Sequence, residues 1–191
     1  MKNKGFTLIE VLAVIIILGV ILLIAVPSYT AYINSSRKSG YYTDISSYIE
    51  SLKGTIMLRD YGSLPEEGEV LVVPILLNGK ENVRLEKSTD GKSPFGTYND
   101  NKCYLVVVPR VANGATESLV YDYYAVFLDR ANYGVNNVAS TRLSKTSIVH
   151  IANEGDVISI SDIVSGGRVL TYDGVNYSLC SDRTTSYLLC D

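Results

Sequence analysis

One uninterrupted apolar run near the N-terminus constrains this chain more than any other feature. The run extends from Val11 to Val26, is preceded by Glu10 and ends at Pro27. A helix needs about 20 largely apolar residues to span the hydrocarbon core of a bilayer. Residues 6–27 are therefore predicted to form a transmembrane helix.

The residues that flank the run indicate how this helix is oriented. Lys2 and Lys4 precede it, and such positive charges stay on the cytoplasmic side of a membrane. The C-terminal domain is therefore expected on the outer side. An ordinary secretory signal carries small residues in an A-x-A-like pattern after its apolar region. Residues 24–28 match that pattern poorly, so a helix that remains in the membrane fits better.

Glu10 is the residue that a plain membrane anchor does not explain. A carboxylate inside a membrane-spanning segment is costly, so a function is the default interpretation. A second interpretation comes from Thr7, three residues earlier. Thr and Glu at this spacing can form a capping box, in which each side chain bonds a backbone amide of the first helical turn. The two interpretations are compatible, because a carboxylate near a helix N-terminus also suits the helix dipole.

The segment that contains both residues resembles the class III signal of the type IV pilin family. It reads Lys4-Gly5-Phe6-Thr7-Leu8-Ile9-Glu10-Val11. The likeness consists of a basic leader ending in Gly, a Phe after it, a Glu at the fifth position of the mature chain, and an apolar stretch. The family includes pilins, type II secretion pseudopilins and competence pseudopilins. The resemblance covers the chain to about residue 60.

The resemblance implies that residues 1–5 are a leader peptide. A prepilin peptidase would cut between Gly5 and Phe6, and the same class of enzyme would N-methylate Phe6. Gly5 would be required because it has no Cβ, which allows the peptidase to approach the backbone closely. Both reactions belong to the peptidase, so no catalytic residue is predicted in this chain.

The resemblance also implies a role for Glu10 in assembly. The amine that cleavage creates at Phe6 would pair with Glu10 of a neighbouring subunit as a filament grows. Glu10 would then have a partner in the filament and none in the lipid, where an unpaired charge is costly. The implied partners are further copies of the chain, minor pilins, the prepilin peptidase, an inner-membrane assembly platform, and membrane lipid before assembly.

The helix is expected to continue as an amphipathic segment over residues 28–60. Its bulky residues recur at spacings that place them on one helical face. They are Tyr29, Tyr32, Ile33, Tyr41, Ile45, Tyr48, Ile49, Leu52 and Ile56. Packing of the tyrosine rings explains this face better than charge transport or adhesion does. Pro27 lacks the amide that would bond Leu23, so a kink or local melting is expected there.

Residues 61–191 are predicted to form a globular β-rich domain, an antiparallel sheet packed on the C-terminal half of the helix. The chain is thus expected to be α+β, with the pilin fold that the resemblance implies. Strand signals occur at Val70–Leu77, Cys103–Val108, Leu119–Leu128, Thr146–Ile151, Val157–Ile160, Arg168–Tyr172 and Tyr177–Cys180. Pro74 places the first strand at an edge or a bulge. The segment from Ser93 to Tyr98 is similar to a turn that precedes the sheet in pseudopilins and some Gram-positive pilins.

All three cysteines, Cys103, Cys180 and Cys190, follow the predicted membrane span, on the side where disulfides persist. The resemblance favours a bridge between Cys180 and Cys190, because many pilins close a C-terminal loop in this way. A bridge that involves Cys103, and the absence of any bridge, remain open because the number of cysteines is odd.

Other classes of function find little support in the sequence. The net charge is −3 and no long run of Lys or Arg occurs, so no nucleic-acid-binding surface is predicted. His150 is the single histidine, and a zinc site would need it to converge with all three cysteines. The P-loop, G-x-S-x-G and H-E-x-x-H motifs do not occur. No cofactor, metal site or enzymatic activity is therefore predicted.

The sequence thus predicts a structural subunit of a type IV pilus, held in the membrane before assembly and found on the cell surface afterwards. One alternative is a pseudopilin of a type II secretion or DNA-uptake system. The other is a membrane-anchored domain that never polymerises. Gly5, Phe6 and Glu10 separate this last class from the others, because only a processed and assembling subunit needs them.

Overall fold

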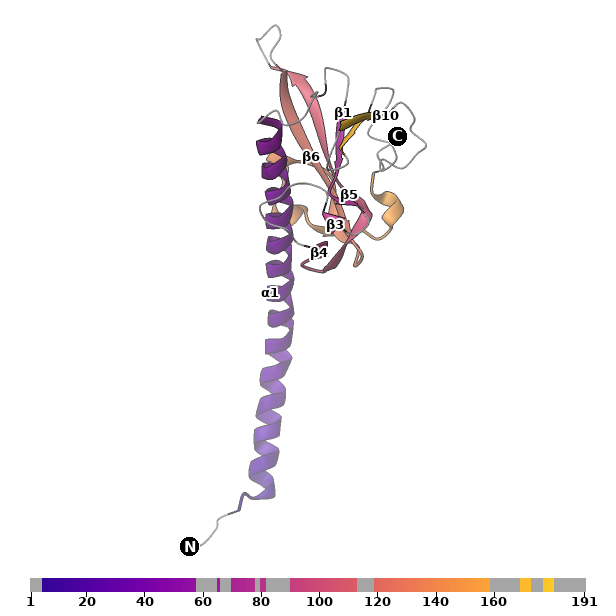
Figure 1. The fold of residues 1–191 in the computed structure, drawn as a ribbon. Coiled ribbons are helices and arrows are strands. Elements are labelled where there is room, and N and C mark those ends of the chain that lie inside the picture. The colour runs from indigo at the N-terminus through magenta and orange to yellow at the C-terminus, as the bar shows by residue number, and fades with distance from the viewer. Residues whose placement is uncertain are drawn as a thin grey trace. The chain divides into compact units, whose positions relative to one another are not determined.

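The computed structural model describes residues 5–57, 65, 70–77, 80–81, 90–112, 119–158, 169–172 and 177–180. The chain divides into two compact units, Met1–Arg37 and Lys38–Asp191. The first unit contains the N-terminal part of one long helix. The second contains the rest of that helix and a β-sheet (Figure 1).

The long helix, α1, extends from Leu8 to Met57 over 50 residues. It confirms the predicted N-terminal helix, which begins slightly later than Phe6. Pro27 lies inside α1, and the helix is continuous through it. Hydroxyl groups bond backbone carbonyls close to the proline: Ser28 Oγ donates to the Ile24 oxygen at 3.1 Å, and Thr30 Oγ1 donates to the Pro27 oxygen at 2.9 Å. The kink at Pro27 stays a prediction.

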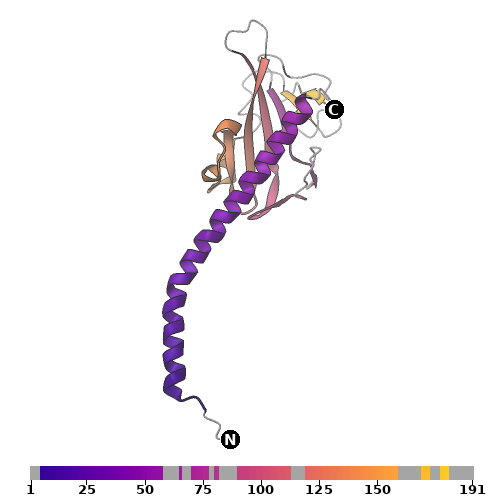
Figure 2. The ribbon, with the colours of Figure 1, turned by 90° about the vertical axis from the view of Figure 1, so that its left-hand side faces the viewer.

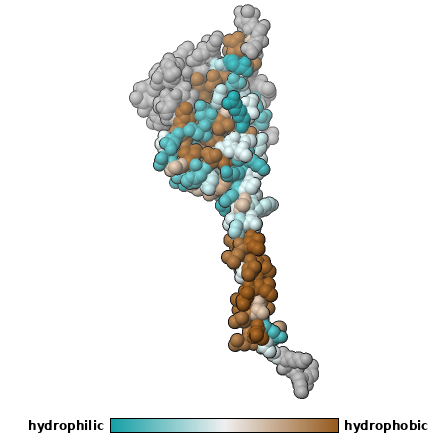
Figure 3. Space-filling view, turned by 180° about the vertical axis from the view of Figure 1, so that it is seen from behind, coloured by the Kyte–Doolittle hydropathy of each residue, from teal (hydrophilic) through white to brown (hydrophobic). Residues whose placement is uncertain are grey.

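In the first unit, the side chains of α1 are mostly apolar and point outward. Leu12 is 52% exposed and Leu23 is 77% exposed, and Figure 3 shows an almost continuous hydrophobic stretch along this part of the helix. Within the described part of the chain, α1 is the one helix that is long and apolar enough to cross a membrane. Lipid or other apolar helices would remove this surface from water.

In the second unit, the strands form one large sheet in the order β10-β9-β1-β5-β6-β7-β8, with β4 paired to β5. The bounds are β1 Val70–Pro74, β4 Lys92–Ser93, β5 Gly96–Val111, β6 Leu119–Asp129, β7 Tyr133–Ala139, β8 Val149–His150, β9 Val169–Tyr172 and β10 Tyr177–Cys180. A separate pair consists of β2 (Leu76–Leu77) and β3 (Lys80–Glu81). The sheet is antiparallel as predicted, except that β1 and β9 pair in parallel.

Several strand predictions are confirmed and others are wrong. Cys103–Val108 and Leu119–Leu128 lie within β5 and β6, and β9 and β10 occupy the last two predicted segments. Pro74 does not mark an edge, because β1 lies between β9 and β5. A proline is tolerated there because the pairing of β1 with β9 involves Val70–Val72 and ends before Pro74, so that no amide of residue 74 is needed in this ladder.

Two predicted strands near the end of the described region also need correction. Most of Thr146–Ile151 is not a strand: a short 3₁₀ turn, Lys145–Ser147, is followed by the two residues of β8. Val157 and Ile158 are not in a strand, and the rest of that predicted segment lies outside the described residues. Hydroxyl side chains satisfy backbone groups locally in this region, as when the Ser144 amide donates to Ser147 Oγ at 3.2 Å. Such bonds compete with pairing between strands.

The sheet is buried on both faces, and the side chains of its central strands alternate between two clusters. Leu105 and Val107 belong to the cluster that also contains the helix, whereas Tyr104 and Val106 belong to the opposite one. This alternation follows from the period of two in a β-strand. Five residues of the predicted helical face are buried against the sheet: Tyr41, Ile45, Tyr48, Ile49 and Leu52. Figures 1 and 2 show the C-terminal part of α1 lying across one sheet face.

Aromatic rings fill much of this helix–sheet contact. The Tyr41 and Tyr98 ring centroids are 5.2 Å apart in an edge-to-face arrangement, and Tyr48 stacks on Phe127 at 5.7 Å. Two of the phenol hydroxyl groups also donate hydrogen bonds. The Tyr41 hydroxyl donates to the Tyr133 carbonyl oxygen, and the Tyr98 hydroxyl donates to the Asp44 carboxylate, both at 3.1 Å. The packing interpretation of the helix tyrosines is confirmed for Tyr41 and Tyr48.

Candidate processing and assembly site

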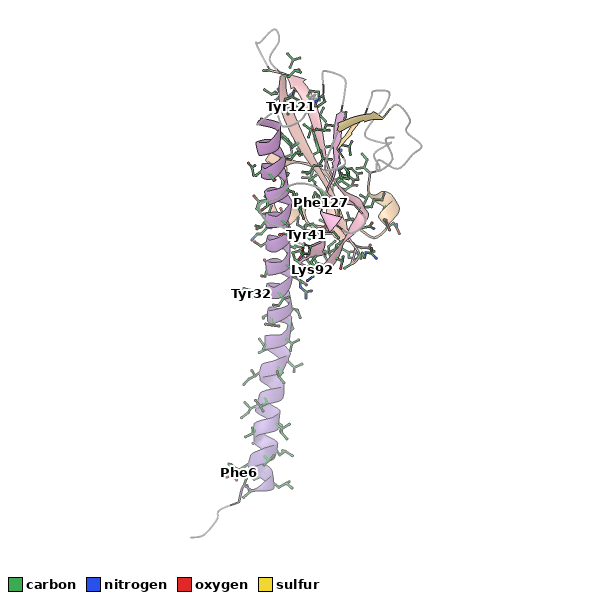
Figure 4. All side chains as sticks on the ribbon, in the orientation of Figure 1. Phe6, Tyr32, Tyr41, Lys92, Tyr121 and Phe127 are labelled. Atoms are coloured by element: carbon green, nitrogen blue, oxygen red, sulfur yellow. The ribbon has the colours of Figure 1, made fainter. Side chains whose placement is uncertain are left out.

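Gly5 and Phe6 lie just before α1, outside its regular backbone. Phe6 is 88% exposed and stands at the N-terminal end of the helix in Figure 4. A Cβ added to Gly5 would meet no atom within 4 Å. Nothing in the described chain therefore demands a glycine at this position, which agrees with a requirement imposed by a peptidase that binds the segment. The peptide bond between the two residues is not enclosed in helical hydrogen bonds.

Thr7 and Glu10 form the capping box that their spacing allows. The Thr7 backbone amide donates to Glu10 Oε2 at 2.8 Å, and the Thr7 hydroxyl donates to the same oxygen at 2.8 Å. In return, the Glu10 amide donates to Thr7 Oγ1 at 3.4 Å. Amides at a helix start have no partner within the helix, so these bonds explain why α1 begins at Leu8.

These contacts bear on the state of Glu10 before assembly. Thr7 supplies the carboxylate with two neutral donors from within the same chain, whereas a positively charged partner is expected only from a neighbouring subunit. Both bonds join the carboxylate to the positive end of the helix dipole, which favours a negative charge. The pairing of Glu10 with a neighbouring subunit stays a prediction, and it has to be compatible with these bonds.

The cysteines occupy very different places. Cys103 is fully buried on β5, where its thiol donates to the Leu128 carbonyl oxygen at 3.2 Å. Cys180 is the last residue of β10, and its side chain and all of Cys190 lie outside the described residues. The predicted bridge between Cys180 and Cys190 stays a prediction. The core position of Cys103 gives the alternative pairings no support.

His150 lies exposed on the edge strand β8, with its ring 5.2 Å from the Tyr133 ring in an edge-to-face contact. This contact supports the packing interpretation of the histidine. Burial raises the pKa of the Tyr41 and Tyr98 phenols well above their ordinary value, with nearby Asp44 adding to the effect. Neutral phenols suit their role as hydrogen-bond donors at the helix–sheet contact.

Asp129, at the end of β6, is a fully buried carboxylate that the residue patterns of the sequence do not single out. It accepts hydrogen bonds from the Ala131 amide at 2.9 Å and from the Tyr133 amide at 2.8 Å. One sequence signal could have identified it: the Asp ends an apolar strand and precedes a turn. An Asp in this position can accept a hydrogen bond from the backbone amide two residues later. Its role here is to shape the turn between β6 and β7.

The comparisons with known proteins agree with the N-terminal geometry. Residues 1–26 match the family model described as the prokaryotic N-terminal methylation motif. The chain therefore carries a class III signal, which is characteristic of type IV pilins and pseudopilins. The motif supports a type IV pilin-like prepilin, and the long N-terminal helix followed by an antiparallel sheet matches the α+β pilin fold. No curated protein and no solved structure matches the chain.

The motif has consequences for the class of protein and its processing. It indicates a structural, non-enzymatic protein. It also implies processing by a prepilin peptidase and assembly into pilus-like polymers. Together with the apolar helix, it fits a membrane-anchored pilin.

Proposed function

We propose that this chain is a structural subunit of a type IV pilus. The observation that carries the proposal is the placement of Gly5, Phe6 and Glu10 at the start of an apolar helix whose side chains face outward. A membrane anchor needs the apolar helix alone. A subunit that is cut, methylated and polymerised also needs the glycine, the new N-terminal residue and the carboxylate.

In this proposal, the subunit first rests in the membrane with residues 6–27 as its span and the globular domain outside. A prepilin peptidase removes residues 1–5 on the cytoplasmic side and N-methylates Phe6. The apolar helix then leaves the lipid and packs against the helices of other subunits, so that its side chains stay out of water throughout. The mature protein would be part of a filament on the cell surface.

Glu10 would control the register of incoming subunits. A carboxylate in an apolar environment is stabilised by a positive partner, and the methylated amine of a neighbouring Phe6 is such a partner. Further copies, minor pilins and an inner-membrane assembly platform would be the partners of the chain during this step. A pseudopilin of a secretion or DNA-uptake system shares the same N-terminal motif and is the main alternative.

The proposal is tested with Glu10→Ala in cells that possess a type IV pilus system. We expect normal cleavage, because the scissile bond lies four residues from the changed side chain, and a strong loss of filament in the sheared surface fraction. Leu12→Ala on the same helix is the matched control and should assemble far better. Normal filament yield from Glu10→Ala would contradict the pairing mechanism.

A further inference from the structure

We infer that Tyr29 and Tyr32 bind the ester and headgroup layer of the membrane's outer leaflet and thereby fix how deep α1 lies in the lipid. The partner of this surface is phospholipid. The inference needs a membrane-anchored chain and nothing more of the proposed function, so it holds whether or not the chain polymerises.

Both side chains lie outside the contact between helix and sheet. Tyr29 is 65% exposed and Tyr32 is 71% exposed, whereas Tyr41 and Tyr48 are buried against the sheet. Among the described residues, no hydrogen bond or ring contact involves the side chain of Tyr29 or Tyr32. Their spacing of three places them on the same side of the helix, and Tyr32 projects outward from α1 in Figure 4. Packing within the described chain therefore does not account for these two rings.

The position of the pair along α1 matches the membrane interface. From Leu8 to Pro27 the helix is about 30 Å long, which is the thickness of the hydrocarbon core. Tyr29 and Tyr32 follow about 3 and 8 Å beyond Pro27, and the interfacial layer on each side of the core is roughly 5–8 Å thick. Both rings fall within that layer. Figure 3 shows the strongly apolar surface of α1 giving way to a paler surface farther along the helix.

The chemistry of a phenol suits this layer. The ring is apolar and the hydroxyl is polar, so the side chain prefers a place where one end is in lipid and the other is hydrated. The neighbouring hydroxyl groups are already used: Ser28 Oγ donates to the Ile24 oxygen at 3.1 Å, and Thr30 Oγ1 donates to the Pro27 oxygen at 2.9 Å. The two phenols are therefore the hydroxyl donors that residues 28–33 offer to ester carbonyls, phosphates and water.

The absence of tryptophan from the sequence allows a direct measurement of depth, because each Trp variant then has a single emitter. Tyr29→Trp and Tyr32→Trp are reconstituted as full chains in phosphatidylcholine vesicles at a low protein-to-lipid ratio. Quenching by lipids brominated near the ester groups is compared with quenching by lipids brominated near the chain ends. Leu18→Trp, inside the predicted span, is the deep control, and Tyr42→Trp, in the second unit, is the control outside the lipid.

We expect Tyr29→Trp and Tyr32→Trp to be quenched roughly twice as strongly near the ester groups as near the chain ends. Leu18→Trp should show the reverse, and Tyr42→Trp should be quenched little by either lipid. Quenching of the two reporters that is no stronger near the ester groups would overturn the inference. Protection from quenching that grows with the protein-to-lipid ratio would also overturn it, because a second copy of the chain would then cover the rings.

A second comparison tests whether the pair fixes the depth of α1. Leu23→Trp, near the outer end of the predicted span, is the reporter, alone and combined with both Tyr29→Ala and Tyr32→Ala. Loss of the pair should change the ratio of shallow to deep quenching at residue 23 by roughly twofold, whereas Tyr42→Ala should leave it unchanged. An unchanged ratio after loss of both tyrosines would overturn the anchoring role. Neither comparison measures filament, so its failure leaves the proposed function standing.

Discussion

Asp129 and Ser93 meet inside the second unit, where the Ser93 hydroxyl donates to Asp129 Oδ2 at 2.9 Å. The Asp129 side chain is fully buried, and its other oxygen accepts the amides of Ala131 and Tyr133. The Ser93 oxygen in turn accepts the Phe95 amide at 3.1 Å. One carboxylate therefore ties the β4–β5 turn to the β6–β7 turn.

Asp129→Ala should destabilise the second unit by about 3 kcal/mol, because three partly buried hydrogen bonds to one buried carboxylate are lost at once. Asp129→Asn should cost clearly less, since an amide oxygen can still accept the two backbone amides. Denaturant unfolding of the full chain in detergent micelles measures both. Equal stability of the Ala variant and the unaltered protein would show that the carboxylate does not hold the two turns.

Gly134 on β7 lies at a position where the fold has room only for glycine. A Cβ at this position would lie 1.9 Å from the Phe127 carbonyl oxygen, which belongs to the neighbouring strand β6. Gly134→Ala therefore requires the two strands to separate, and we expect a loss of about 3 kcal/mol or more in unfolding free energy.

Gly155→Ala is the matched control, because a Cβ there would meet nothing within 4 Å. It should change the unfolding free energy by less than about 1 kcal/mol. The same denaturant unfolding experiment compares the two variants. A Gly134→Ala protein as stable as Gly155→Ala would mean that β6 and β7 do not approach this closely.

The buried phenols predict a loss of stability at alkaline pH. Burial raises the pKa of Tyr98 far above its ordinary value and that of Tyr123 to about 12. An unfolded tyrosine ionises near pH 10, so above that pH the unfolded chain binds fewer protons than the folded one. The contribution of the neutral phenols is complete below about pH 10 and is lost as pH rises toward the folded pKa values.

Tyr98→Phe tests this dependence. Each such tyrosine lowers the unfolding free energy by up to about 1.4 kcal/mol per pH unit above pH 10, so the variant should show a correspondingly shallower decline between about pH 10 and 12. At neutral pH it should lose about 1 kcal/mol, because its bond to Asp44 is gone. An unchanged alkaline slope would contradict the buried position of the phenol.

Cys103 should resist alkylation in the folded protein. Its side chain has no exposed surface, so an alkylating reagent cannot reach the sulfur while the protein is folded, and buried structural cysteines are inert. In the full chain under non-reducing conditions, the Cys103 thiol should react with the alkylating reagent only after the protein is unfolded. If Cys180 and Cys190 are bridged, two more should appear after reduction. Labelling of Cys103 in the native protein would place this residue outside the core.

The sequence predicts the long helix and the strands β5 and β6 well because their signals are local. An apolar run fixes the membrane span, and helical spacing identifies the face formed by Tyr41, Ile45 and their neighbours. The capping box can also be seen in the spacing of Thr7 and Glu10. Whether the box and the pairing between subunits can coexist depends on which carboxylate oxygen is used, and spacing does not specify this.

Structural features that arise from contacts between distant parts of the chain are not predicted from the sequence. The strand β7 contains a glycine and two asparagines and resembles a turn in sequence, and Asn137 within it has a positive φ of 52°. It is a strand because β6 pairs with it on one side and β8 on the other. The parallel pairing of β1 with β9 joins segments far apart in the chain, which no local pattern encodes.

The most direct test of the central claim is the intact mass of the protein recovered from a sheared cell-surface fraction. The proposed function predicts a chain that lacks residues 1–5 and carries one additional methyl group, located on Phe6 by fragmentation. An uncut chain that is found in the membrane fraction and is absent from sheared material would contradict it, and would favour an anchored domain that does not polymerise.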